Sequence, residues 1–366
     1  MTDSTFEYVF PAVRGIQAGR EYYISMCPLR LIPKIFLFDD EELVPELRAQ
    51  RVLNRSRIPE IADYIVDNRD SYVFSAITAS IDGSVSFEPL GNSGDSSRVG
   101  SLRVDMSSRF IVNDGQHRRA AIEEAIKRDP KLGDETLAVV FFLDRGLGRC
   151  QQMFADLNRH AVRPARSLGL LYDHRNALAH LARLVVAHSN AFHGLVEMER
   201  STLSERSRKL FTLSAIHAGN AALVGSREIA DTNAEARLFA EFWDEVAKYM
   251  PEWGLVRNGK MTAGEVRREF IHSHALALQA IGIAGAKLLE LPADQWKARL
   301  KSLGKIDWAR SNAGLWEGRA MIGGRVSKAS QNVTLTVNLI KRHLKLSLTP
   351  EEERAEDAMR RGRDAN

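Results

Sequence analysis

The hydrophobic pattern of the first 166 residues predicts a mixture of strands and helices. The run Leu137–Asp144 is apolar on both faces, which favours a central strand. In Ile58–Asn68 the apolar residues fall on one face of a helix. The pair Asp82-Gly83 lies between two strand-like runs and predicts the tight turn of a β-hairpin. Three further runs are typical of strands: Arg20–Leu31, Ile35–Phe38 and Arg109–Asn113.

Beyond residue 166 the pattern changes to long amphipathic helices, and strand signals nearly vanish. The sequence therefore predicts an α+β fold, with a mixed α/β domain at 1–166 followed by a mainly helical region at 167–349. We expect the charged tail at 350–366 to be poorly ordered. The predicted helices include Ala177–Ser189, Ala234–Met250, Glu269–Leu291 and Ser330–Leu348.

The composition is ordinary for a soluble globular protein and names no function. Lys and Arg outnumber Asp and Glu by 51 to 47, and this net charge of +4 permits binding to a polyanion without requiring it. Cys27 and Cys150 cannot supply a four-cysteine zinc site or a disulfide framework, so a reducing cytoplasm is the expected location. No secretory signal or run of ~18 apolar residues is present, and we expect no membrane partner.

Candidate chemistry gathers in the stretch FIVNDGQHRRAAIEEAI, residues 110–126. If a strand ends before Asp114 and a helix begins among the arginines, Asp114–Arg119 form the turn between them. The free N–H groups and partial positive charge of a helix N-terminus attract anions to such a turn. Asp114 has two possible roles, since it can cap the helix or hold a divalent cation.

The other side chains of the turn suit a phosphate group. Gly115 lets a ligand approach the backbone, and Arg118 and Arg119 offer charged donors to phosphate oxygens. His117 can donate a hydrogen bond or move a proton near neutral pH. In the structural alternative, Asp114 is only a cap, the arginines are solvated and His117 packs against the sheet.

The octapeptide DGQHRRAA, residues 114–121, resembles the signature of the DGQHR-domain proteins. Over nearly the whole chain the sequence resembles one family of them, the DndB regulators of bacterial DNA phosphorothioate (sulfur) modification systems. The matching segments are PAVRGIQAGREYYISMCPLRLIPKIF, QRVLNRSRIPEIADYIVDNRDSYVFSAITASIDG and QQMFADLNRHAVRPARSLGLLYDHRN. The resemblance implies a DNA-binding repressor that limits sulfur modification by acting on the promoter of its own gene cluster. It further implies contact with other sulfur-modification proteins, and a symmetric operator would suggest a homo-oligomer.

The motif is also similar, more distantly, to the Gly-x-x-Arg phosphate-binding turn of ParB and sulfiredoxin proteins, with Gly115 and Arg118 at the matching positions. This similarity implies a bound nucleotide, ATP or CTP with magnesium, held at Asp114–Arg119 by Gln116 and Arg119 as well. In the DndB family the segment Asp156–Asn158 recurs beside the turn, which implies that Asn158 orients a ligand. On the residues alone, Asn158 is an ordinary helix C-cap, and both interpretations stay open.

A second hypothesis makes the protein an enzyme, either a nucleotide hydrolase (ATPase or CTPase) or a nuclease. Asp114 and His117 would then be the catalytic residues. A clear second carboxylate for a two-metal centre is missing from the sequence, because Asp144 and Asp156 are only loosely placed. Since His272 and His274 are two apart on a predicted helix, they point in different directions, and we predict no metal site there.

Several basic residues are candidates for contact with DNA phosphates, although each also suits a solvated helix face. Thr334–Leu346 would be the recognition helix of a helix-turn-helix. Cys27, beside Arg30, is either a redox-responsive thiolate that affects DNA binding or a small buried hydrophobe. The basic candidates are Arg163, Arg166, Arg206, Arg208, Lys341 and Arg342.

Overall fold

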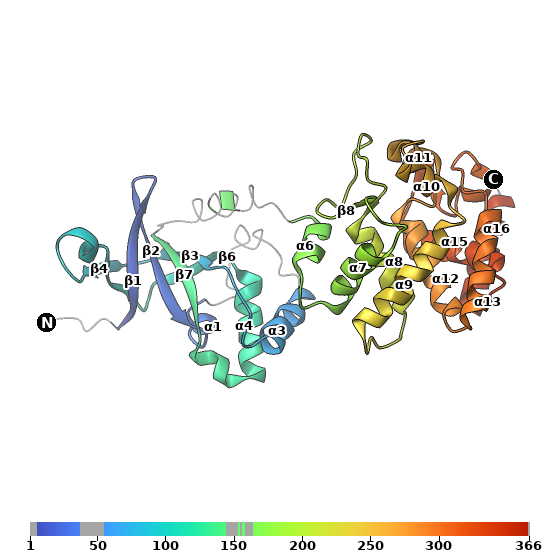
Figure 1. Ribbon diagram of the computed structural model, residues 1–366. Helices are drawn as coiled ribbons and strands as arrows, with labels where there is room; N and C mark the ends of the chain where they lie inside the picture. Colours follow the sequence, from blue (N-terminus) through green and yellow to red (C-terminus); the bar gives the residue numbers. More distant parts are fainter. Residues whose placement is uncertain (1–5, 37–54, 144–152, 154–155, 158–163, 365–366) are drawn as a thin grey trace. The chain divides into compact units, whose positions relative to one another are not determined.

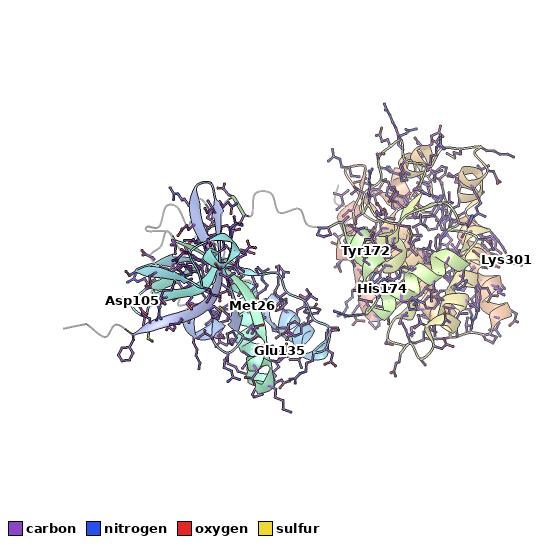
Figure 2. All side chains as sticks on the ribbon, turned by 60° about the vertical axis from the view of Figure 1, so that its left-hand side comes forward. Met26, Asp105, Glu135, Tyr172, His174 and Lys301 are labelled. Carbon is purple, nitrogen blue, oxygen red and sulfur yellow. The ribbon has the colours of Figure 1, made fainter. Side chains whose placement is uncertain are left out.

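The computed structural model describes residues 6–36, 55–143, 153, 156–157 and 164–364, with side chains up to residue 361. The chain divides into two compact units, residues 1–162 and 163–366 (Figures 1 and 2). Each unit has a hydrophobic core of its own. The first is a mixed α/β unit and the second is mainly helical, which confirms the predicted fold class.

The first unit is built on a mixed sheet of seven strands in the order β4-β5-β1-β2-β7-β3-β6. Only β3 and β7 run parallel, and the other neighbours are antiparallel. β7 lies inside the sheet between β2 and β3, as its continuous apolar run predicts. The strands are β1 (Glu7–Gln17), β2 (Arg20–Pro28), β3 (Ile77–Asp82), β4 (Val85–Pro89), β5 (Val99–Asp105), β6 (Arg109–Asp114) and β7 (Thr136–Leu143).

The predicted hairpin at Asp82-Gly83 is wrong, because β3 and β4 do not pair with each other. They stand five positions apart in the sheet, about 24 Å if the sheet were flat. Yet only two residues, Gly83 and Ser84, separate Asp82 from Val85, and the three Cα–Cα steps between them reach about 11 Å at most. The sheet therefore curls so that its two ends approach. The rings of Phe10 on β1 and Phe110 on β6 confirm this, since their centroids lie 6.4 Å apart although the strands are not neighbours.

Helices α1 (Ile32–Ile35), α3 (Arg57–Asp67) and α4 (Gln116–Arg128) pack against the curled sheet, where Ala121, Ile122 and Ala125 of α4 are buried. The strand predicted at Ile35–Phe38 is wrong where the structure describes it. Pro33 stands in the first turn of α1, where its missing N–H costs nothing. The described part of the unit also contains two short 3-10 helices, η1 (Gly94–Ser97) and η2 (Pro130–Asp134).

The second unit packs α8 against α12 and α7 against α9 around the fully buried side chains of Trp243, Trp253 and Trp316. Its helices are α6 (Arg166–Tyr172), α7 (Ala177–His188), α8 (Leu213–Val224), α9 (Thr232–Ala247), α10 (Pro251–Arg257), α11 (Ala263–Glu269), α12 (Ala275–Leu288), α13 (Ala293–Leu300), η3 (Lys301–Lys305), α14 (Ala313–Trp316), α15 (Ser330–His343) and α16 (Pro350–Asp364). Two short strand pairs join them, β8 (Val196–Glu197) with β9 (Phe211–Thr212) and β10 (Met321–Ile322) with β11 (Arg325–Val326).

The tail that the sequence predicts to be poorly ordered is instead helix α16. Acidic residues fill its first turn, where their negative charges interact favourably with the helix dipole and stabilise the helix. Glu356, 2% exposed, forms an ion pair with Arg319 at 2.6 Å, and Lys341 on α15 pairs with Glu352 at 2.5 Å. The first pair docks α16 on the segment between α14 and β10, the second docks it on α15, and together they explain its order.

Candidate functional site

The turn at Asp114–Arg119 joins β6 to α4, as the sequence predicts. Gly115 is the N-cap of α4 and has a φ of 111°, a conformation that favours glycine. A Cβ at this position would also lie 2.9 Å from Cγ1 of Ile77. Asp114 is the last residue of β6, and the N-cap of α4 is Gly115, which has no side chain to cap the helix.

Arg118 forms an ion pair with Asp114 one helical turn earlier. Its Nη2 donates to Oδ2 of Asp114 at 2.7 Å and to the carbonyl of Ala76 at 3.1 Å. The Nε of Arg118 is buried and has no hydrogen-bond partner among the described residues. A phosphate at this turn would have to compete with a carboxylate that already holds the guanidinium.

Arg119 and Gln116 make contacts that hold the fold together. Arg119 donates to the carbonyls of Phe36 at 2.9 Å and Pro33 at 3.0 Å, which ties α1 to α4. Gln116 is 5% exposed, and its Nε2 donates to the carbonyl of Val112 at 3.0 Å. In this arrangement neither side chain presents its donors to a ligand, because burial and these carbonyls occupy them.

Met153 contacts β6, the strand that leads to the turn. Asn113, which precedes Asp114, is fully buried, and its Nδ2 contacts Oγ of Ser80 at 2.7 Å and Sδ of Met153 at 3.2 Å. Asn158 itself lies outside the described residues, as do Cys150 and Arg163.

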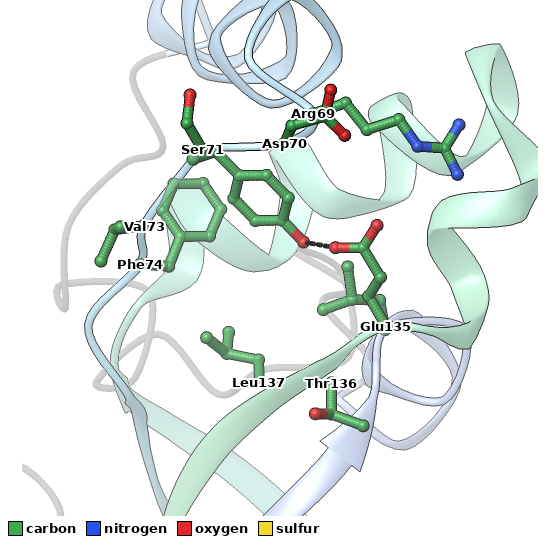
Figure 3. A pocket seen from close by; sticks show the side chains of 10 residues that line it. Arg69, Asp70, Ser71, Val73, Phe74, Glu135, Thr136 and Leu137 are labelled. Atoms are coloured by element: carbon green, nitrogen blue, oxygen red, sulfur yellow. Dashed lines mark hydrogen bonds between the residues drawn. The ribbon is translucent and has the colours of Figure 1, made fainter.

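A pocket of about 320 Å³ opens at the start of β7 (Figure 3). Its wall includes the segment 69–74, and the hydroxyl of Tyr72 donates to Glu135 at 2.5 Å. Burial, followed by the neighbouring Glu135, raises the pKa of Tyr72. In the sequence, the only signal of this pocket is the aromatic pair Tyr72 and Phe74, which lines it. The same segment leads to Ala76, whose carbonyl binds Arg118.

The interpretation of Cys27 as a reactive thiolate is wrong. The side chain is fully buried, and burial raises the pKa of its thiol to about 11. Arg30 cannot offset this, because its guanidinium pairs with Asp134 and donates to the carbonyl of Gly133. Cys27 is a packing residue of the first core and is not placed to contact DNA.

Three of the predicted DNA contacts are exposed on the helical unit: Arg166, Arg206 and Arg208. None of them makes a hydrogen bond or ion pair with another described residue. Arg206 and Arg208 belong to the segment 198–210 between β8 and β9, which we call the basic loop.

The backbone of the basic loop is held by Arg267 of α11. Its guanidinium donates to the carbonyls of Ser204, Ser207 and Lys209. Gly264 allows this approach, because a Cβ there would lie 2.3 Å from the carbonyl oxygen of Glu205. No local pattern predicts the role of Arg267, since these carbonyls lie 58 to 63 residues away in the chain.

The predicted recognition helix is covered by α16. Lys341 is 6% exposed and paired with Glu352, so it is not placed to contact DNA. Asn338 is fully buried and donates to the carbonyl of Glu352 at 2.9 Å. Arg342 is 42% exposed, but it pairs with Glu356 at 3.3 Å.

His272 and His274 form hydrogen bonds within the helical core. The indole of Trp253 donates to Nδ1 of His272 at 3.0 Å, and Nε2 of His272 contacts Glu252 at 3.0 Å. Nε2 of His274 contacts the carbonyl of Arg267 at 2.8 Å. Among the described residues, no group of three or more His, Cys, Asp or Glu side chains is arranged to hold a metal ion. Within the same residues, no helix is both long and apolar enough to cross a membrane.

Comparison with known proteins agrees with the resemblance seen in the sequence. The family DndB, described as DNA-sulfur modification-associated, matches residues 10–347. No curated protein and no solved structure matches the chain. The match spans both units and includes the turn, the basic loop and α15. The chain therefore belongs to the DndB family of proteins associated with DNA sulfur modification.

Proposed function

We propose that this protein is a DNA-binding repressor of a DNA sulfur-modification gene cluster, acting at the promoter of that cluster. Membership of the DndB family places the chain in DNA sulfur modification. The observation that supports DNA binding is the basic loop. Two of its exposed arginines, Arg206 and Arg208, have no hydrogen-bond or ion-pair partner among the described residues.

The basic loop suits a DNA backbone for two physical reasons. Arginines without carboxylate partners are free to neutralise phosphates, which releases counterions from the duplex. In addition, Arg267 fixes the loop backbone before DNA arrives, so less conformational entropy is lost on binding. Such contacts position the protein without reading sequence, so promoter recognition requires further contacts to the bases.

The test compares a double variant, Arg206→Gln with Arg208→Gln, with a control that loses the same charge elsewhere on the helical unit. Arg237→Gln with Lys305→Gln is that control, because both residues are exposed and have no partner among the described residues. Fluorescence anisotropy against a duplex is measured over a series of salt concentrations. We expect the basic-loop variant to bind at least about tenfold more weakly, with the log–log salt slope reduced by about two.

Repression adds a requirement for sequence preference. The parent protein should bind its own promoter fragment more tightly than a scrambled duplex of equal length and charge. A pseudo-palindromic operator would match a homo-oligomer, which light scattering of the free and bound protein measures. Equal affinity for both duplexes would argue against a repressor, and an unchanged salt slope in the loop variant would remove the basic loop from the interface.

We further propose that the Asp114–Arg119 turn binds the phosphates of a nucleotide, ATP or CTP with magnesium. The position of the turn at the N-terminus of α4 and the buried, unpartnered Nε of Arg118 support this proposal. Backbone N–H groups and Arg118 would hold the phosphates, while Arg119 and Gln116 keep their scaffold contacts. Whether the nucleotide is hydrolysed is a separate question, which product release in the presence of ATP or CTP answers.

A further inference from the structure

A second group of cationic side chains lies on the helical unit, at the start of α6 and α8. Ser167 is fully buried, and its backbone N–H donates to Oγ of Ser201 at 2.9 Å. Its Oγ in turn accepts the N–H of Ser214 on α8 at 3.2 Å. These bonds fix the position of Arg166, the residue before Ser167, beside the first turns of α8.

His217 lies one helical turn beyond Ser214, and therefore on the same face of α8. Both of its ring nitrogens are buried, and neither has a hydrogen-bond partner among the described residues. A buried polar atom without a partner costs free energy, and two on one ring require an explanation such as a ligand. Burial and the charge of Arg166 lower the pKa of His217.

Lys328 completes the group from the segment between β11 and α15. The residue is exposed, and partial burial, followed by the charge of Arg166, lowers the pKa of its ammonium group. Neither Arg166 nor Lys328 forms an ion pair with any carboxylate in the described part of the chain. Like charges gathered without a counterion are unfavourable, and a bound anion would relieve their repulsion.

The donors of this group are side chains and not the helix end. Thr212 caps α8 by accepting the N–H of Ala215 at 3.2 Å, and the N–H of Ser214 is bound to Ser167. An anion would therefore meet a guanidinium, an ammonium and an imidazole. The planar fork of an arginine matches the oxygens of a phosphate group.

We propose that Arg166, His217 and Lys328 form a phosphate-binding site on the helical unit, distinct from the Asp114–Arg119 turn. The phosphate is either a backbone phosphodiester of DNA or that of a free compound such as a nucleotide. The DNA alternative rests on the proposed repressor function, whereas the site itself does not.

The experiment uses the full chain with Arg166→Gln, Lys328→Gln and the two combined, and it uses Arg237→Gln with Lys305→Gln as the control of equal charge. A third variant, His217→Gln, removes the imidazole. Circular dichroism and thermal melting first establish that each variant is folded. Three probes follow: a labelled duplex over a salt series, inorganic phosphate, and ATP, the last two by calorimetry and thermal shift.

If the site binds DNA, the double variant loses about tenfold in duplex affinity and about two in salt slope, while the control does not. If it binds a free phosphate compound, inorganic phosphate stabilises the parent and the control but not the double variant, and ATP stabilises the double variant less than the control, because the Asp114–Arg119 turn is intact in both. Either result supports the site, and His217→Gln should weaken the same probe. Variants that match the control with all three probes would overturn it. A parent that fails to bind duplex would refute the repressor function and leave the phosphate and ATP probes to decide the site.

Discussion

At the scale of single residues, the turn at Asp114–Arg119 presents a competition. The guanidinium of Arg118 is held by Asp114 and by a backbone carbonyl, and a phosphate would have to displace at least one of them. The sequence predicts that Asp114 assists a ligand. The geometry adds the opposite possibility, that Asp114 holds Arg118 until a ligand arrives.

Two substitutions separate these roles in binding of ATP or CTP. Arg118→Ala should weaken nucleotide binding by about tenfold, since a charged hydrogen bond is worth about 1.5–3 kcal/mol. Asp114→Asn should strengthen binding without magnesium, because the competing charge is gone. If Asp114 instead holds the cation, Asp114→Asn weakens binding only when magnesium is present. Calorimetry measures both, with the exposed Lys127→Ala on the same helix as control. Parental affinity in Arg118→Ala would exclude a phosphate site at this turn.

Buried histidines give the helical unit a dependence on pH. His274 caps α12, and burial lowers its pKa to about 4, below the ordinary 6.5. Between pH 6.5 and 4, His274 is therefore protonated in the unfolded chain but neutral in the folded chain. Stability is complete above pH 6.5 and falls as the pH drops through this window, by about 3 kcal/mol.

Denaturant unfolding of the parent and of His274→Gln at pH 7, 5.5 and 4.5 measures this effect. Gln can still donate to the carbonyl of Arg267 but does not titrate. The variant should lose less stability than the parent as the pH falls. The difference between the two isolates His274 from the carboxylates, which also respond at the acid end. Parallel losses in the two proteins would show that His274 does not cause the acid sensitivity.

At the scale of elements, the sequence predicted correctly those helices, strands and turns that depend on the preferences of neighbouring residues. The change from an apolar strand to an acid, a glycine and a helix at residues 109–128 was recognisable, because each part has its own short-range preference. Elements that depend on contacts with distant parts of the chain were not recognisable from the sequence. Phe36 ends a helix whose carbonyls bind Arg119, far along the chain, and β3 and β4 pair with strands on either side of the curled sheet.

Helix α16 shows the same limit, since its ordering depends on Arg319, 37 residues away from Glu356. Glu356→Gln leaves Arg319, 8% exposed, with a buried charge and no carboxylate. We expect the free energy of unfolding to fall by about 3–5 kcal/mol. Denaturant titration checks this, with the exposed pair variant Glu351→Gln as control, which should change stability by less than about 1 kcal/mol. An effect of Glu356→Gln as small as that of the control would mean that α16 is held by other contacts.

At the scale of the whole molecule, the family was recognisable from the sequence and most of the candidate sites were recognisable only in part. The turn and the exposed arginines stand in short motifs. Arg267, His217 and Lys328 do not, because their partners come from other elements of the helical unit. The net charge of +4 does not indicate these local groups of basic side chains, because ion pairs elsewhere in the chain cancel most of the charge.

The two separate cores lead to a last prediction about unfolding. Because the units have independent hydrophobic clusters, heating should produce two transitions and not one. Cys27→Ser buries a hydroxyl in the first core, which costs about 1–3 kcal/mol and should lower only the transition of the first unit. Glu356→Gln should lower only the other. Each kcal/mol corresponds to about 2–4 °C for units of this size. Differential scanning calorimetry of the parent, both single variants and the combination resolves the assignment. A single transition that both substitutions lower together would mean that the units unfold as one cooperative body.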